Sequence, residues 1–202
     1  MKLKNLILML NLAVVAFSAN SIWAEEVWVV GGGTAAGIQT PSEEDSIMGI
    51  RMSIGYAENK RMYGFDFGTI GNMTKDDFRG MAISGIFNIT GGRADVILMQ
   101  AAGGINWNIK RTQVFGTQFA IGVNVNQERA DIYGLQMGLI GNFGNNNIYG
   151  FQMGMYNQAN QVYGFQVGLV NRAVSLTGIQ LGLLNFVEKG WLKFFPFLNV
   201  GF

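Results

Sequence analysis

The chain contains no cysteine and no histidine, and only two prolines. Without cysteine it has no disulfide scaffold, no thiolate metal site, no cysteine nucleophile and no lipid-modified N-terminal cysteine. Without histidine it lacks the commonest general base and metal ligand, and a Ser-His-Asp triad is impossible. We therefore expect a protein that is not an enzyme, with no catalytic residues, no cofactor and no metal.

Charge is also scarce. The 202 residues include 14 Lys+Arg and 13 Asp+Glu, and charged residues make up 13% of the chain, against about 25% in a typical protein. This near-neutral balance gives no reason to expect nucleic acid as a partner. Hydrophobic residues make up 49%, which is too apolar for a disordered chain. Glycine, at 29 residues, is about twice as frequent as usual.

The first 24 residues have the layout of a secretory signal peptide. Lys2 and Lys4 precede an apolar run from Leu6 to Phe17, and small residues follow up to Ala24. A membrane anchor needs about 20 mainly apolar residues, and asparagines interrupt this segment. We predict cleavage after Ala24 and one mature domain over residues 25–202. An exported chain without cysteine is typical of a bacterial envelope.

A repeat organises the mature chain. Its clearest copies are YGLQMGLIGN at 133–142, YGFQMGMYN at 149–157, YGFQVGLVN at 163–171 and TGIQLGLLN at 177–185, with weaker copies over 48–126. The shared core alternates with period two: Phe165, Val167 and Leu169 on one face, glycine and Gln166 on the other. This alternation is typical of a β-strand with one apolar face.

The repeat can be aligned on its glutamine. The aligned positions are spaced 14–18 residues apart, which allows one strand and one tight turn per repeat. In a closed sheet these side chains are expected to line the lumen. The candidate residues are Arg51, Asp66, Gln100, Gln118, Gln136, Gln152, Gln166 and Gln180, with Ala82 between Asp66 and Gln100.

Two architectures fit a strand-turn repeat: an antiparallel barrel in the outer membrane, or a soluble solenoid of stacked strands. The uninterrupted apolar face favours the barrel, as do the tyrosines at strand starts (Tyr63, Tyr133, Tyr149 and Tyr163), which would form an interfacial girdle. We therefore predict an all-β, antiparallel up-and-down transmembrane β-barrel of about 10–12 short strands, one per repeat.

The repeat resembles a bacterial surface-repeat family found in spirochaetes and other Gram-negative genera, with tandem Gly-apolar-Gln-x-Gly-Leu-x-Asn units. The match is best over residues 133–185. The resemblance implies a place at the cell surface and brings no assigned reaction. The terminal Phe202 resembles the assembly signal of outer-membrane barrels, which implies the barrel assembly machinery and outer-membrane lipid as partners.

These observations predict a structural or surface protein of the cell outer membrane. One alternative is a narrow passive channel, lined by the Gln row, that passes a small solute. Another is a soluble, surface-exposed β-repeat binding protein. The Gln row itself is either a cross-strand amide ladder or a polar constriction.

Arg51 and Asp66 occupy the Gln position of adjacent repeats. If the chain folds as a hairpin through Glu58 and Asn59, their numbers place them directly opposite each other as an ion pair. The alternative is two separately hydrated charges in a wet lumen.

Overall fold

The computed structural model describes residues 27–34 and 38–202, and every regular element in that part of the chain is a β-strand. The predicted signal peptide, residues 1–24, lies outside the described residues. The strands are β1 (Val27–Gly33), β2 (Gln39–Thr40), β3 (Ser46–Ser53), β4 (Tyr56–Asn59), β5 (Arg61–Gly68), β6 (Gly71–Thr74), β7 (Phe78–Ser84), β8 (Phe87–Thr90), β9 (Ala94–Ala102), β10 (Ile105–Asn108), β11 (Thr112–Ala120), β12 (Val123–Gly138), β13 (Gly141–Met153), β14 (Tyr156–Val167), β15 (Val170–Val187) and β16 (Phe194–Gly201).

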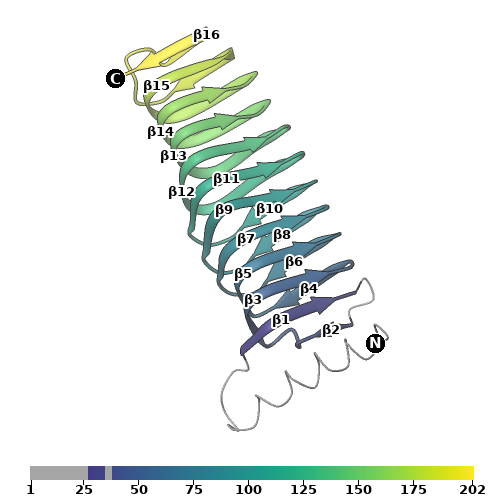
Figure 1. Ribbon diagram of the computed structural model, residues 1–202. Coiled ribbons are helices and arrows are strands. Elements are labelled where there is room, and N and C mark those ends of the chain that lie inside the picture. The colour runs from purple at the N-terminus through teal and green to yellow at the C-terminus, as the bar shows by residue number, and fades with distance from the viewer. Residues whose placement is uncertain (1–26, 35–37) are drawn as a thin grey trace.

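These strands wind into a parallel β-solenoid of about ten coils (Figure 1). Sheet 1 contains β1, β3, β5, β7, β9 and β11, followed by the second halves of β12 and β13 and by segments of β14 and β15, all parallel. Sheet 2 contains β4, β6, β8 and β10, followed by the first segments of β12 to β15. From β12 onward one continuous strand bends around a corner and belongs to both sheets.

The predicted antiparallel barrel is therefore wrong. Neighbouring repeats run parallel and pair in register, so that Gln118 lies beside Gln136 and Gln152 beside Gln166. The residues after each glutamine, expected to form a tight turn, instead make the corner and the short strand of sheet 2. The terminal Asn of each repeat gives the motif a direction, and only a parallel arrangement brings these asparagines to the same place in every coil.

The two ends of the solenoid carry antiparallel strands. At the C-terminal end β16 pairs antiparallel with β15, and at the N-terminal end the short β2 pairs antiparallel with β1. Phe202 follows β16 and is fully exposed. Its role as an assembly signal stays a prediction.

The interior contains one apolar column and several polar ones. The apolar column runs along the start of the sheet 1 strands and is formed by Ile47, Met62, Phe78, Val96, Val114, Ile132, Ile148, Val162 and Leu176, with a register shift between Phe78 and Val96. The remaining inward positions hold small alanines, such as Ala94 and Ala130, or polar side chains. The buried polar side chains must find hydrogen-bond partners inside the protein.

The two glycines of the repeat have separate structural reasons. Gly164 has a φ of 132°, and a Cβ there would lie 2.2 Å from the carbonyl oxygen of Gly150. At Gly168 a Cβ would lie 2.1 Å from the carbonyl oxygen of Gly154 and 2.6 Å from the side-chain nitrogen of Asn157. The first glycine thus permits a backbone conformation that other residues rarely adopt, and the second leaves space for the backbone of the preceding coil and for an asparagine of the interior.

Candidate functional site

The glutamines form a continuous ladder inside the solenoid. Each side-chain amide donates to the oxygen of the glutamine one coil earlier, as from Gln180 to Gln166 and from Gln166 to Gln152, both at 2.7 Å. The ladder continues to Gln100 with distances of 2.7, 2.8 and 2.9 Å. The structure thus brings together all six predicted Gln residues, in a packed interior rather than around a barrel lumen: Gln100, Gln118, Gln136, Gln152, Gln166 and Gln180 are at most 1% exposed.

A second ladder, which sequence analysis missed, is formed by the asparagine that ends each repeat. Its members are Asn72, Asn88, Asn106, Asn124, Asn142, Asn157, Asn171 and Asn185, joined by hydrogen bonds of 2.8 or 2.9 Å. These asparagines also donate to backbone carbonyls at the ends of sheet 1 strands, as Asn171 does to Leu181. The recurring asparagine is visible in the sequence, but asparagine at the end of a strand is also typical of turns.

The two ladders point in opposite directions. The glutamines donate toward the N-terminal end of the solenoid, as from Gln180 to Gln166, and the asparagines toward the C-terminal end, as from Asn157 to Asn171. Their side-chain dipoles therefore oppose each other across the interior. Chains of amides in which both the donor and the acceptor are used stabilise a unique register, because a slipped coil would leave buried polar groups unpaired.

Arg51 and Asp66 form the predicted ion pair. The Nε and Nη2 atoms of Arg51 donate to the two carboxylate oxygens of Asp66 at 2.8 and 2.6 Å, and both side chains are buried. The hairpin register was wrong: the two residues are parallel neighbours, and Glu58 and Asn59 lie in β4. Burial raises the pKa of Asp66, and the positive charge of Arg51 opposes that rise.

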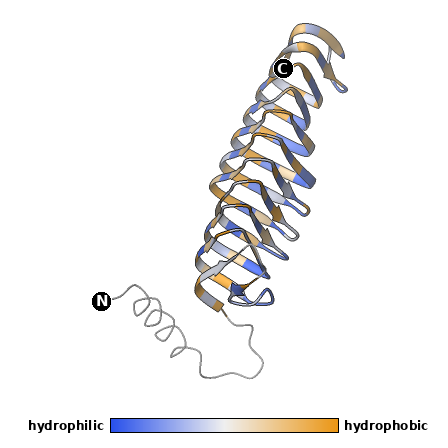
Figure 2. Ribbon diagram, turned by 90° about the vertical axis from the view of Figure 1, so that its right-hand side faces the viewer, coloured by the Kyte–Doolittle hydropathy of each residue, from blue (hydrophilic) through white to orange (hydrophobic). Residues whose placement is uncertain are grey.

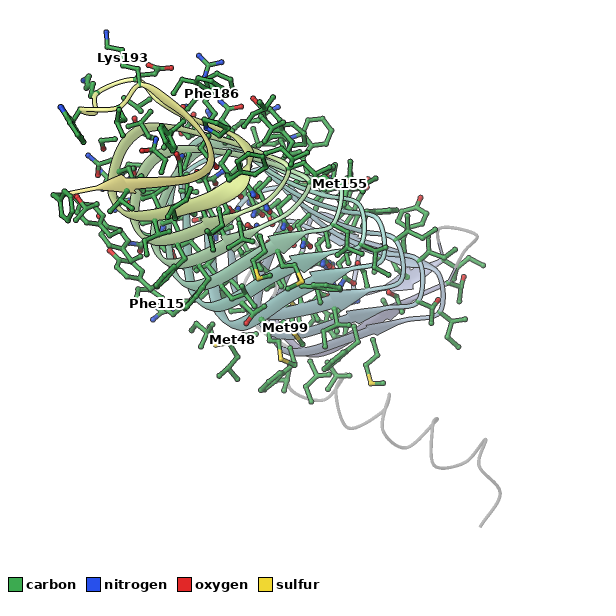
Figure 3. All side chains as sticks on the ribbon, turned by 90° about the horizontal axis from the view of Figure 1, so that it is seen from above. Met48, Met99, Phe115, Met155, Phe186 and Lys193 are labelled. Atoms are coloured by element: carbon green, nitrogen blue, oxygen red, sulfur yellow. The ribbon has the colours of Figure 1, made fainter. Side chains whose placement is uncertain are left out.

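The outward side chains of sheet 1 are almost entirely apolar. They form three columns, and aromatic rings stack along them: Tyr133 stacks on Tyr149 with ring centroids 4.8 Å apart, and Phe151 on Phe165 at 4.9 Å. Met48, Met99 and Phe115 are seen on this side in Figure 3. The tyrosine column begins with Met48, Tyr63 and Arg79, and Arg79 pairs with the acidic Asp95; after a register shift in β9 it continues with Ile97, Phe115, Tyr133, Tyr149, Tyr163 and Thr177. The middle column consists of Ile50, Phe65, Met81, Met99, Thr117, Leu135, Phe151, Phe165 and Ile179, and the inner column of Met52, Phe67, Ile83, Ala101, Phe119, Met137, Met153, Val167 and Leu181.

The two edges of the solenoid differ in chemistry, and each kind of residue recurs from coil to coil (Figure 2). The corner after sheet 1, here called the apolar edge, carries Ile70, Ile86, Ile121, Leu139, Ile140, Met155, Leu169, Leu183 and Leu184, all exposed. The corner after sheet 2, here called the charged edge, carries Lys75, Asp76, Asp77, Arg93, Lys110, Arg111, Glu128, Arg129 and Glu188.

Ion pairs along the charged edge are mostly exposed. Lys110 pairs with Glu128 in the next coil at 3.0 Å, and such pairs contribute little to stability. Asp131, beside this edge, differs because its side chain is only 2% exposed. Burial acts to raise the pKa of Asp131, but the hydrogen bonds from Asn147 and Arg129 outweigh it and hold that pKa below its usual value.

The apolar edge and the inner column meet in a shallow depression of about 330 Å³, lined by Met137, Leu139, Met153, Met155, Val167 and Leu169. Among the described residues no group of three or more acidic side chains is placed to hold a metal ion. That part of the chain also has no helix long and apolar enough to cross a membrane.

These features define a class: a parallel β-solenoid with amide ladders inside and apolar side chains outside. Comparison of the chain with protein-family models, with curated proteins and with solved structures finds no match. The resemblance to the bacterial surface-repeat family therefore stays a prediction.

Proposed function

We propose that the protein is an exported, non-catalytic scaffold of the bacterial cell surface that attaches to outer-membrane lipid through its apolar exterior. The observation that carries the proposal is the continuous apolar surface formed by the outward columns of sheet 1 and the apolar edge. Phe115, Leu139 and Met155 on this surface are 51%, 50% and 59% exposed.

The size of this surface separates it from the ordinary exposed hydrophobics of a soluble protein. Nine coils at about 4.8 Å and three columns at about 7 Å give a face of roughly 43 Å by 21 Å, or about 900 Å². The largest apolar patch of a typical monomer is about 300–600 Å². The apolar edge adds to this area, and surfaces of this extent mark sites of protein or membrane association.

The interior chemistry is compatible with contact to lipid. A hydrocarbon environment requires every polar group of the protein to be paired internally. Between its ends the solenoid largely fulfils that requirement, because each coil bonds to the coils on both sides and the buried amides pair in ladders. The exceptions among the described buried side chains there are Asn72 Oδ1, Ser84 Oγ and Trp107 Nε1, which have no partner. Lipid can therefore cover the apolar exterior with few polar groups left unpaired.

The test is flotation of the mature protein with vesicles of phosphatidylethanolamine and phosphatidylglycerol on a density gradient. We expect the protein to float with the vesicles. Phe151→Lys, on the apolar face, should reduce the floating fraction several-fold, whereas Glu128→Lys on the charged edge should not, although it introduces the same side chain. Wild-type protein that stays at the bottom of the gradient would contradict the proposal.

A further inference from the structure

We infer that the solenoid lies on its side in one leaflet of the membrane, with the apolar edge deepest in the hydrocarbon and the charged edge in water. The inference rests on the proposed function and adds an orientation to it. The two edges are the starting point: residues such as Leu139 and Leu169 line one, and residues such as Lys110 and Glu128 line the other.

The outer face of sheet 1 shows a graded change in polarity between these edges. The tyrosine column lies next to the charged edge, the middle column is mainly phenylalanine and aliphatic, and the inner column adjoins the apolar edge. In the coil around β14 the order is Tyr163, Phe165, Val167 and then Leu169. Tyrosine and tryptophan concentrate at the headgroup level of membranes, whereas aliphatic residues favour the hydrocarbon.

Sheet 2 shows the same order on the opposite side. Its outward column next to the apolar edge consists of Tyr56, Gly71, Phe87, Ile105, Val123, Gly141, Tyr156 and Val170. The column next to the charged edge consists of Glu58, Met73, Ile89, Trp107, Val125, Phe143, Gln158 and Arg172. It is still largely apolar, but it contains three strongly polar side chains, whereas the column next to the apolar edge contains none. The outer faces of both sheets therefore become less polar toward the apolar edge.

The charged exceptions on the two outer faces strengthen this assignment. Arg79 on sheet 1 and Glu58 and Arg172 on sheet 2 all lie in the columns that adjoin the charged edge. If the apolar faces were covered by a second copy of the chain, nothing would require these charges to collect at one depth. A lipid leaflet does require it, because the cost of a charge rises with depth.

The dimensions fit one leaflet. From Tyr163 to Leu169 the chain advances six residues, which is about 20 Å at roughly 3.3 Å per residue. The hydrocarbon of one leaflet is about 15 Å deep, and the headgroup region above it adds about 5–7 Å. With the tyrosines in that headgroup region, the apolar edge reaches the bilayer centre without crossing it.

The absence of cysteine allows a direct test. One coil contains Glu128 on the charged edge, Tyr133 in the tyrosine column and Leu139 on the apolar edge. Each is replaced singly by cysteine and labelled with an environment-sensitive fluorophore, and circular dichroism checks the fold. The labelled proteins are bound to vesicles of the same lipids that carry a nitroxide either near the headgroup or deep in the acyl chain.

We expect the label at Leu139 to be quenched at least twofold more by the deep nitroxide, the label at Tyr133 more by the shallow one, and the label at Glu128 by neither. Protein that floats but shows equal quenching at Leu139 and Glu128 would overturn the orientation and leave the proposed function intact. Protein that does not float overturns both, and an increase in mass on gel filtration without lipid would then identify a second copy as the occupant of the apolar face.

Discussion

Arg51 and Asp66 begin the buried column that the glutamines continue. They occupy the same position in adjacent coils as Gln152 and Gln166 do farther along, and Ala82 separates them from Gln100. Because the pair is bidentate and Arg51 also donates to the Asn59 side chain and the Met73 carbonyl oxygen, both charges are satisfied within the first coils. The pair thus replaces amide pairing where the ladder of glutamines ends.

The ion pair yields the first prediction. Asp66→Asn removes the negative charge and leaves Arg51 buried and unpaired, which should reduce the free energy of unfolding by about 3–5 kcal/mol. Arg51→Gln combined with Asp66→Gln should recover most of that loss, because two neighbouring amides can pair as the other glutamines do. Denaturant unfolding of the wild type, Asp66→Asn, the single variants Arg51→Gln and Asp66→Gln, and the double variant measures this. A double variant whose loss equals the sum of the losses in Arg51→Gln and Asp66→Gln would show that the two residues do not couple.

The second prediction concerns the middle of the Gln ladder. Gln152 donates to Gln136 and accepts from Gln166, both at 2.7 Å. Gln152→Leu keeps the volume but leaves one buried acceptor and one buried donor unpaired, at a cost of about 1–3 kcal/mol each. The matched control is Gln127→Leu at an exposed position of the charged edge, which should change stability by less than about 0.5 kcal/mol. Equal effects in thermal unfolding would mean that the ladder does not stabilise the coils.

The sequence allowed several features to be predicted. Period-two alternation in Gly164 to Gly168 correctly indicated strands with glutamine and phenylalanine on opposite faces. The place of Arg51 and Asp66 at the Gln position of adjacent repeats correctly indicated neighbours, although the hairpin register was wrong. Parallel and antiparallel pairing were not separable from the core motif, because Gly-apolar-Gln-apolar-Gly reads the same in both directions. The deciding residue was the terminal asparagine, such as Asn171, which is typical of turns as well as of ladders.

The apolar face of the repeat did not distinguish a barrel from a solenoid, for a related reason. A row such as Phe151 and Phe165 on one side and glutamines on the other is expected both in a barrel with lipid outside and in a solenoid with amides inside. Strand length does not separate the two either: the sheet 1 strands β3 and β5 have eight residues each and β9 and β11 nine, at or just below the roughly 9–11 that a membrane-spanning strand needs.

The third prediction is a pH dependence that arises from Asp131. Its pKa is lower in the folded protein than its usual value, so the carboxylate stabilises the fold above the unfolded pKa of about 4. That stability is lost as the pH falls through the folded pKa. Asp131→Asn should therefore be less stable than wild type at pH 6 and should show a smaller loss of stability between pH 6 and pH 2.5. Unfolding midpoints at a series of pH values measure this, and parallel curves for the two proteins would exclude Asp131 as the source.

The fourth prediction uses a coil in which a leucine replaces the first glycine of the repeat. Leu98 lies beside Gly116 in the neighbouring strand and has a φ of 71°, and its side chain is 64% exposed. A non-glycine residue in this conformation lowers the free energy of unfolding by about 1–2 kcal/mol. Because the leucine side chain is mostly exposed, its burial contributes little stability to offset that cost. Leu98→Gly should therefore raise the free energy of unfolding by roughly 1 kcal/mol, or about 2–4 °C in Tm.

The reverse change in the next coil should act in the opposite direction. Gly116 has a φ of 128°, and a Cβ there would lie 2.2 Å from the carbonyl oxygen of Leu98. Gly116→Ala therefore combines backbone strain with a clash against backbone and should lower stability by about 2–4 kcal/mol. Thermal unfolding followed by circular dichroism measures both variants. A destabilised Leu98→Gly would show that the leucine side chain contributes more to packing along the outer face than its strained backbone costs.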